Sequence, residues 1–137
     1  MARKFSWYCE PPEWSHTPER LSVIIGFKTD FWQSTFYEFQ RDNGHFYQTE
    51  VEGDFSAEVL VNGYYEELYD QAGWMLRVDA LNWTKAGIEF TDGAQHFSTV
   101  ITRDGFLDWS VIPLGVRVKP IRLRLTRHSE ALRIQYH

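Results

Sequence analysis

The sequence predicts an all-β protein, and three observations lead to that prediction. Short stretches of alternating apolar and polar residues recur along most of the 137 residues, as half-buried strands require. Turn dipeptides separate these stretches at close intervals. No window sustains the 3.6-residue period of an amphipathic helix. Short strands with turns between them indicate a two-sheet sandwich or a barrel.

The length and composition fit a single domain, residues 1–137, with one core. Aromatic residues make up 17% of the chain, which supplies bulk for a core and rings for a groove. The net charge of −5 argues against general affinity for nucleic acid or anionic membranes. The N-terminus lacks a secretory signal, and the longest apolar stretch, Leu21–Phe27, is too short to span a bilayer. A cytoplasmic protein is therefore expected.

The N-terminal half is expected to hold several short strands. In order, it contains a short strand at 4–8, an irregular proline-rich segment at 11–18 with Trp14 packed on a sheet edge, a strand at 21–27 buried on both faces, a loop at 28–35, an extended stretch at 36–39, a hairpin turn at 42–44 and a strand at 45–51. Cys9 is the only cysteine, so no internal disulfide can form, and nothing in the sequence activates it.

The C-terminal half has clearer alternation and more turn signals. In order, it contains a strand at 55–61, a hairpin turn at 62–63, a lead-in strand at 64–68, a hairpin of 69–79 and 83–90, a turn at 92–93, a strand at 97–103, a turn at 104–105, a strand at 106–112, a break at Pro113 and Gly115, and strands at 116–118, 121–126 and 132–136.

The hairpin from Tyr69 to Phe90 carries the best candidate site. One predicted face is apolar and consists of Ala72, Trp74, Leu76 and Val78 on the first strand and Ala86, Ile88 and Phe90 on the second. The other predicted face carries Gln71, Arg77, Lys85 and Glu89, with Gly73 and Gly87 between them. Glycines in a strand let a ligand approach the backbone. The alternative is an ordinary solvated face, because any antiparallel sheet with one wet side shows polar alternation.

Three further residues are candidate walls for that site. Trp32 comes two residues after Asp30, and Trp109 comes directly after Asp108, both in loop-like contexts, so each ring either lines a groove or fills the core. His45 either donates a hydrogen bond into the groove or satisfies a structural one. We predict a ligand-binding set of Gln71, Arg77, Lys85, Glu89, Trp32, His45 and Trp109.

Five motifs, in this order, resemble a known family. They are Thr29-Asp30-Phe31-Trp32, Phe39-x-Arg41-Asp42-Asn43-Gly44-His45-Phe46, Tyr69-Asp70-Gln71-Ala72-Gly73-x-Met75-x-Arg77, Trp83-x-Lys85-x-Gly87-x-Glu89 and Asp108-Trp109-Ser110. So ordered, they resemble the small concanavalin A-like proteins labelled "regulation of enolase". The resemblance implies a two-sheet antiparallel jelly roll with a concave sheet that holds carbohydrate in related lectins and glucanases. Family members continue past the strand that matches 132–136, whereas this chain stops at His137. Either it is a shortened form that lacks the last strands of that fold, or the sandwich closes differently. Missing strands would leave apolar surface uncovered, which favours self-association, for example as a homodimer, or instability.

Catalysis has little support in the residues. Glycoside hydrolysis requires two carboxylates on one sugar bond, and the candidates are Glu89 and Asp70, with Asp108 as a third. Glucanases of the similar fold carry Glu-x-Asp-x-x-Glu on one strand, which the residues after Glu89 do not match. The five histidines lack metal-ligand spacing, so no metal site and no cofactor is predicted.

Three functions remain open at this point. The first is a non-catalytic domain that binds a carbohydrate-like small polar ligand on its concave sheet. The second is an interaction module for a metabolic enzyme such as enolase, using a late cationic stripe of Arg117, Lys119, Arg122, Arg124, Arg127 and Arg133. The third is a glycoside hydrolase or lyase. The fold alone does not decide among them.

Overall fold

The computed structural model describes residues 4–24, 31–32, 41–42, 44–63, 71–115 and 120–137, and only the backbone at 31, 32, 41, 42 and 115. All regular structure in these ranges is β-strand, which confirms the all-β prediction. The elements expected at 28–30, 36–39, 64–68 and 116–118 lie outside the described residues. The chain divides into two compact units, Met1–Val51 and Glu52–His137, which we describe separately as the N-terminal and C-terminal units. The single domain expected from the length stays a prediction.

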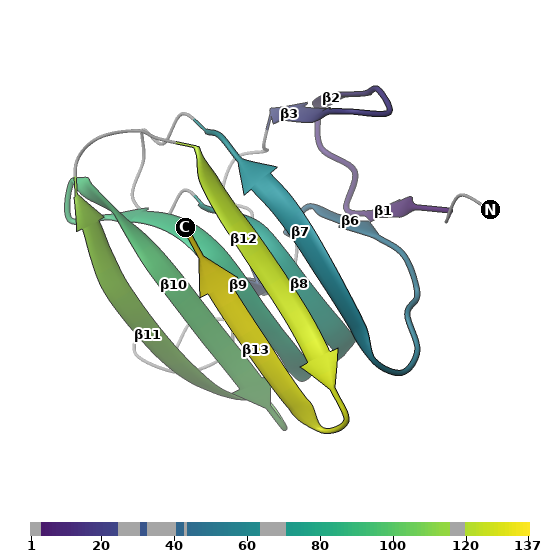
Figure 1. The fold of residues 1–137 in the computed structure, drawn as a ribbon, viewed down its shortest axis with the longest axis vertical. Helices are drawn as coiled ribbons and strands as arrows, with labels where there is room; N and C mark the ends of the chain where they lie inside the picture. Colours follow the sequence, from purple (N-terminus) through teal and green to yellow (C-terminus); the bar gives the residue numbers. More distant parts are fainter. Residues whose placement is uncertain (1–3, 25–30, 33–40, 43, 64–70, 116–119) are drawn as a thin grey trace. The chain divides into compact units, whose positions relative to one another are not determined.

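Figure 1 shows the described strands, coloured in chain order from purple to yellow. They are β1 (Ser6–Tyr8), β2 (Glu13–His16), β3 (Leu21–Ile24), β4 (Phe31–Trp32), β5 (Arg41–Asp42), β6 (Phe46–Gln48), β7 (Phe55–Val61), β8 (Gln71–Asp79), β9 (Asn82–Thr91), β10 (Ala94–Arg103), β11 (Phe106–Gly115), β12 (Ile121–His128) and β13 (Ala131–Tyr136). In these residues no helix has the length and apolar character needed to cross a membrane.

The C-terminal unit is a sandwich of two antiparallel sheets. Four strands form one sheet in the order β11-β10-β9-β8, and three form the other in the order β13-β12-β7. Figure 1 shows the two sheets of this unit lying over one another with their strands roughly aligned, as aligned sandwiches do. Every pairing within them is antiparallel.

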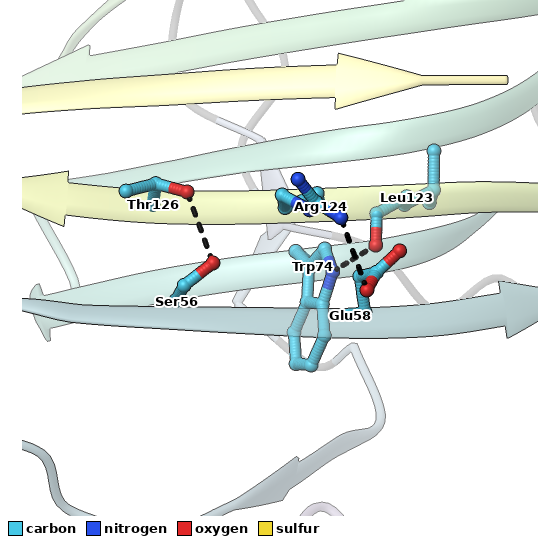
Figure 2. Close-up of polar contacts among 6 residues, drawn as sticks. All are labelled: Ser56, Glu58, Trp74, Leu123, Arg124 and Thr126. Atoms are coloured by element: carbon cyan, nitrogen blue, oxygen red, sulfur yellow. Dashed lines mark hydrogen bonds and ion pairs between the residues drawn. The ribbon is translucent and has the colours of Figure 1, made fainter.

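The core of the sandwich lies between these two sheets. Ala86 and Phe97 of the four-stranded sheet form a cluster with Leu123, which is fully buried. Trp74 packs against this cluster. Its indole Nε1 also donates a hydrogen bond to the Leu123 carbonyl oxygen at 3.2 Å, so one side chain ties the sheets together (Figure 2). The expectation that Trp74 is a core residue agrees with this packing.

Short turns set the register of the four-stranded sheet. Asp92-Gly93 and Asp104-Gly105 each join paired strands, and all four residues have positive φ, between 51° and 81°. This is the backbone that two-residue hairpin turns with Asp-Gly sequences adopt. Between β8 and β9, Asp79 accepts hydrogen bonds from the backbone N–H of Leu81 at 2.8 Å and the side-chain amide of Asn82 at 3.0 Å.

Those two hydrogen bonds also change the acidity of Asp79. The bond from the Asn82 amide, and then the bond from the Leu81 backbone, lower the pKa of this carboxyl below its ordinary value. Hydrogen bonds that favour the ionised form have this effect. Asp79 therefore stays ionised while it holds the turn.

Several expected features of the strands are wrong. The strand at 21–27 was expected to be buried on both faces, but β3 pairs with β2 among the described residues and is exposed throughout, with Ile24 at 59%. Apolar composition therefore did not imply burial here. Val78 was expected on the apolar face but is 85% exposed, because the register shifts between Arg77 and Asp79. Pro113 was expected to break the chain, yet β11 continues through it to Gly115.

Strand position explains why Pro113 is tolerated. In the described sheet β11 lies at the edge and pairs with β10 only. A proline that cannot donate to a ladder is accommodated on an edge strand. A bulge at the same level, between Gln95 and His96 of β10, accompanies it.

Two turn signals of the sequence are flanked by strands whose described partners lie elsewhere in the chain. Asp42-Asn43-Gly44 was expected to close a hairpin, but β5 pairs with β4 and β6 pairs with β1. Asn62-Gly63 follows β7, whose described partner is β12 in the three-stranded sheet. The expected partner of β7 at 64–68 lies outside the described residues.

The N-terminal unit contains a half-exposed aromatic cluster. Tyr47 of β6 contacts Phe5, Trp7, Trp14 and His16, with ring centroids between 4.9 and 6.1 Å apart. Trp14 is 40% exposed, and its indole N–H donates to Glu10 at 2.7 Å. Trp14 therefore packs on a ring cluster that includes side chains of β1 and β6. The irregular segment expected at 11–18 is wrong for Glu13–His16, because these residues form β2 and pair with β3.

The predicted cationic stripe does not form one surface. Arg122, Arg124 and Arg133 share the outer face of the three-stranded sheet, where Arg124 makes an ion pair of 3.3 Å with Glu58 (Figure 2). Arg127 alternates to the other face, and its Nε donates to the Ser129 carbonyl at 3.4 Å. Arg117 and Lys119 lie outside the described residues.

Candidate functional site: the polar face of the four-stranded sheet

The four polar residues predicted from the central hairpin lie on one face. Gln71 pairs directly with Glu89, Met75 with Lys85, and Arg77 with Trp83. These residues alternate with the ones that pack toward the other sheet, so they project from the opposite side. We call this side the polar face; its members used below are Gln71, Gly73, Met75, Arg77, Trp83, Lys85, Gly87, Glu89, His96, Ser98, Val100, Thr102, Leu107, Trp109 and Val111.

One row of the polar face joins three hydrogen-bonding side chains across three strands. Glu89 lies in the middle, between Gln71 of β8 and His96 of β10. His96 Nδ1 is 3.2 Å from the carbonyl oxygen of Ala94. Because a carbonyl only accepts, Nδ1 is the donor, and in the neutral ring Nε2 is then the acceptor. The row therefore offers an amide, a carboxylate and an imidazole side by side.

The next row has almost no side chains. Gly73 pairs with Gly87, which pairs with Ser98. A Cβ on Gly73 would lie 2.2 Å from the Ala86 carbonyl oxygen, and one on Gly87 would lie 2.2 Å from that of Ala72. The close approach of β8 and β9 thus requires glycine at both positions. The same two glycines leave bare backbone between the rows on either side.

The third row carries a cation and an aromatic ring. Lys85 lies between Met75 and Val100, and Trp109 follows on β11. The Trp109 indole N–H donates to the Ser98 hydroxyl at 3.0 Å, so the ring leans back toward the glycine row. The Lys85 ammonium lies 5.6 Å from the centroid of the Trp83 ring, within cation–π range.

The polar face is largely buried, and the expectation of an open, solvated side is wrong. Glu89 is 2% exposed and Ser98 6%, while Gln71, Arg77 and Lys85 are half-buried. This burial also removes the simplest explanation of the alternation, a sheet face made polar by contact with water. Burying polar groups lowers stability unless they are hydrogen-bonded, so their presence here requires a reason other than solvation.

The remaining predicted site residues are not placed on this face by the described structure. His45 belongs to the N-terminal unit, where its Nδ1 donates to the Cys9 carbonyl oxygen at 2.6 Å. This is the structural hydrogen bond that the sequence left open as an alternative. Trp32 lies in β4, but its side chain is outside the described residues.

The carboxylates are not arranged as a pair. Asp108 pairs with Ile101, which puts it on the side of the sheet opposite to Glu89. Asp70, the other weak catalytic candidate, lies outside the described residues. Among the described polar-face residues Glu89 is the one carboxylate, so this part of the chain holds half of what glycoside hydrolysis requires. Within the same residues no three His, Cys, Asp or Glu side chains gather into a potential metal site.

Sequence reasoning missed the contribution of β10. His96, Ser98 and Thr102 lie on the polar face and are each at most 9% exposed. The Thr102 hydroxyl is buried and has no hydrogen-bond partner in the described chain. The signal was present, because a two-residue turn at Asp92-Gly93 fixes the register and sets His96 opposite Glu89. Polarity alone did not reveal it, since both faces of β10 mix polar and apolar residues.

A family model, a curated protein and a solved structure each match most of the chain. A family model described as "Protein of unknown function (DUF1349)" matches residues 7–137. A protein of Saccharomyces cerevisiae named "Regulation of enolase protein 1" is 43% identical over 130 residues, which cover 95% of this chain and 65% of that protein. A crystal structure of a functionally unknown protein from the same organism is 42% identical, with a TM-score of 0.89 over 96% of this chain and 71% of that one. The chain thus spans about two thirds of its named relative.

Proposed function

The chain belongs to this family of proteins of unknown function, and we propose that it binds a small, carbohydrate-like polar ligand on the polar face. One observation carries the proposal. Glu89, His96 and Ser98 are buried on the side of the sheet that does not form the sandwich core. Solvation does not account for their polarity, whereas a binding site needs a few placed polar groups in a shielded cleft.

The chemistry of the polar face suits a polyhydroxylated ligand. Gln71 and Glu89 supply donor and acceptor groups in one row, as vicinal hydroxyls require. The Ser98 oxygen accepts from the Trp109 indole, so its own proton is available for another acceptor. The bare backbone of Gly73 and Gly87 allows a ring to lie close to the sheet. Trp109 provides an apolar surface for the C–H groups of a sugar.

A glycan array followed by calorimetry tests this function. The full chain is expected to bind at least one glycan or monosaccharide, and Glu89→Gln is expected to weaken that binding. Loss of one ligand hydrogen bond corresponds to about 0.5–1.5 kcal/mol, or about two- to twelvefold in affinity. Glu58→Gln is the matched control, since Glu58 lies on the outer face of the other sheet and pairs there with Arg124. Absence of binding by the unmodified chain would end the proposal.

A second candidate function is regulation of an enzyme by direct contact. The observation that favours it is the 43% identical relative named "Regulation of enolase protein 1". Arg122 and Arg133, both exposed on the outer face of the three-stranded sheet, would meet an acidic surface of the partner. Purified enolase is the probe. The function is supported if the unmodified chain binds enolase, the double variant Arg122→Glu with Arg133→Glu loses binding, and the control Arg103→Glu, a charge reversal at the end of β10, keeps it. Equal binding by the unmodified chain, the double variant and the control contradicts it.

A further inference from the structure

The three-stranded sheet has an open edge at β13. Among the described strands, β13 pairs with β12 only. Arg122 of β12 and His137, which follows β13, exchange two backbone hydrogen bonds, of 2.8 and 3.0 Å. In an antiparallel pair, residues bonded in this way recur at every second position, so the odd-numbered residues of β13 direct their backbone groups toward β12. The residues whose N–H and C=O groups point away from β12, toward the open edge, are Leu132, Ile134 and Tyr136.

The inner face of the four-stranded sheet extends past that edge. The ring of Tyr136 packs on Phe97 of β10, with ring centroids 4.6 Å apart, and β11 is the next strand beyond β10. Figure 1 shows β11 lying beyond β13 on the left of the view. Three apolar side chains of β10 and β11 that share a face with Phe97 are exposed, namely Ile101 at 49%, Phe106 at 79% and Ile112 at 49%. Exposed apolar surface therefore lies directly beside the open edge.

We propose that β13 accepts one further antiparallel strand, supplied as an extended peptide segment by a partner protein. Side chains of this strand opposite Leu132, Ile134 and Tyr136 point inward, onto the exposed apolar face of β10 and β11, and are apolar. The side chains between them point outward, where the one opposite Arg133 is acidic, because opposite charges stabilise a cross-strand pair. In strand addition of this kind the main chain supplies affinity and the alternate side chains supply specificity.

The width of the four-stranded sheet favours a lone strand over a second copy of the chain. Antiparallel pairing of two β13 strands would keep the inner faces of both copies on the same side of the joined sheet. Each β13 is backed by its own β10 and β11, so these strands of the two copies would occupy the same space. A peptide has no second layer. It brings one layer of side chains, which the spacing of about 10 Å between stacked sheets accommodates.

Amide hydrogen exchange measured by NMR tests whether the edge is open and whether a strand closes it. In the full chain alone, and after correction for intrinsic rates, the N–H groups of Leu132, Ile134 and Tyr136 are expected to exchange faster than those of Arg133 and Gln135, which are bonded to β12. The probe is the peptide Thr-Val-Glu-Val-Glu-Val-Thr with both ends capped. At saturation it is expected to slow exchange at Ile134 by about tenfold or more.

Fluorescence polarisation of the labelled peptide measures its affinity and the features that determine it. A peptide of the same composition without alternation, Val-Val-Val-Glu-Glu-Thr-Thr, is expected to bind about tenfold or more weakly, because its apolar side chains cannot all point inward. Replacing each Glu of the probe with Lys is expected to weaken binding through repulsion from Arg133, and this difference should become smaller in high salt.

Variants of the chain separate the two features of the docking surface. Leu132→Pro removes an outward N–H without removing a bond to β12, and is expected to weaken binding by about tenfold or more, whereas Leu132→Thr keeps the N–H and stays within about threefold. Ile112→Lys places a charge beneath the added strand and is expected to weaken binding similarly. Leu60→Lys, at a residue 55% exposed on the outer face of β7, is the control and keeps binding. Circular dichroism confirms that each variant is folded.

Several results would overturn the proposal. Exchange at Ile134 as slow as at Arg133 in the chain alone would mean that the edge is already covered. A chain that is dimeric in analytical ultracentrifugation and monomeric as Leu132→Pro would mean that a second copy is the occupant. Failure of the alternating peptide to bind, or unchanged binding by Leu132→Pro or Ile112→Lys, also contradicts the proposal. None of these results bears on the polar face, which lies on the other side of the four-stranded sheet.

Discussion

Replacing Trp74 with phenylalanine should destabilise the protein by about 2 kcal/mol. The change removes the indole N–H that donates to the Leu123 carbonyl at 3.2 Å across the two sheets. Leu123 is fully buried, so its carbonyl loses this donor where water does not replace it. Removing one partner of a buried hydrogen bond costs about 1–3 kcal/mol, and the smaller ring adds a packing loss.

This magnitude converts into a measurable change in melting temperature. At about 2.1 cal/mol/K per residue, unfolding of 137 residues has an entropy of about 0.3 kcal/mol/K. A loss of about 2 kcal/mol then lowers Tm by about 7 °C. Calorimetry and urea unfolding followed by circular dichroism measure the shift and the change in free energy of unfolding.

Trp14→Phe is the matched control for this prediction. It makes the same substitution at an indole that also donates a hydrogen bond, to Glu10 at 2.7 Å, but the residue is 40% exposed. Water replaces the lost partner at an exposed site, so we expect a change of less than about 0.5 kcal/mol. If Trp74→Phe proves no more destabilising than Trp14→Phe, the bond between the sheets does not contribute as argued.

Three further perturbations follow from the structure. Gly87→Ala should lower the free energy of unfolding in urea by more than about 3 kcal/mol, because its Cβ would lie 2.2 Å from the Ala72 carbonyl oxygen. Gly93→Ala is the control: Gly93 has φ +73° and open space around it, so the loss should be about 1–2 kcal/mol. Equal losses for the two variants would contradict the argument from crowding at Gly87. Because the pKa of Asp79 is lowered by folding, its contribution to stability is present above the ordinary pKa of 3.8 and is lost as the pH falls through the lower pKa of the folded state. Asp79→Asn should therefore reduce the fall of Tm at acid pH, as measured by Tm against pH. An unchanged fall of Tm at acid pH would refute this. Arg124→Gln should lower the free energy of unfolding by less than about 1 kcal/mol, because its ion pair with Glu58 is half-exposed, and this loss should become smaller in high salt. A larger loss that salt does not affect would show that Arg124 has a role beyond the ion pair.

The sequence predicted the C-terminal unit far better than the N-terminal one. Asp-Gly turns set the pairing of β9 with β10 and of β10 with β11, because a two-residue turn permits one register. Alternation then placed Gln71, Lys85 and Glu89 on one side of the sheet. Both inferences depend on neighbours in the chain, where local rules are strongest.

The errors arose where distant parts of the chain decide the outcome. The apolar run at β3 is exposed along Leu21–Ile24, where it pairs with β2 among the described strands. The burial of Glu89 depends on what surrounds its face, which no spacing in the sequence encodes. For the same reason, His96 was recognised as a member of the polar face only from the observed pairing of β10 with β9.

The order of strands in the sandwich has a consequence for how the chain reaches its folded state. Strands β8 to β11 follow one another as successive hairpins, so each pairing closes a short loop. The strands β7 and β12 lie before and after that meander in the chain, so the pairing of Ser56 with Thr126 closes a loop that contains the four described strands between them. Closing the longer loop loses more chain entropy before any contact is gained. We therefore expect the β8–β11 meander to form first, and the pairing of β7 with β12 against it to follow in a slower step.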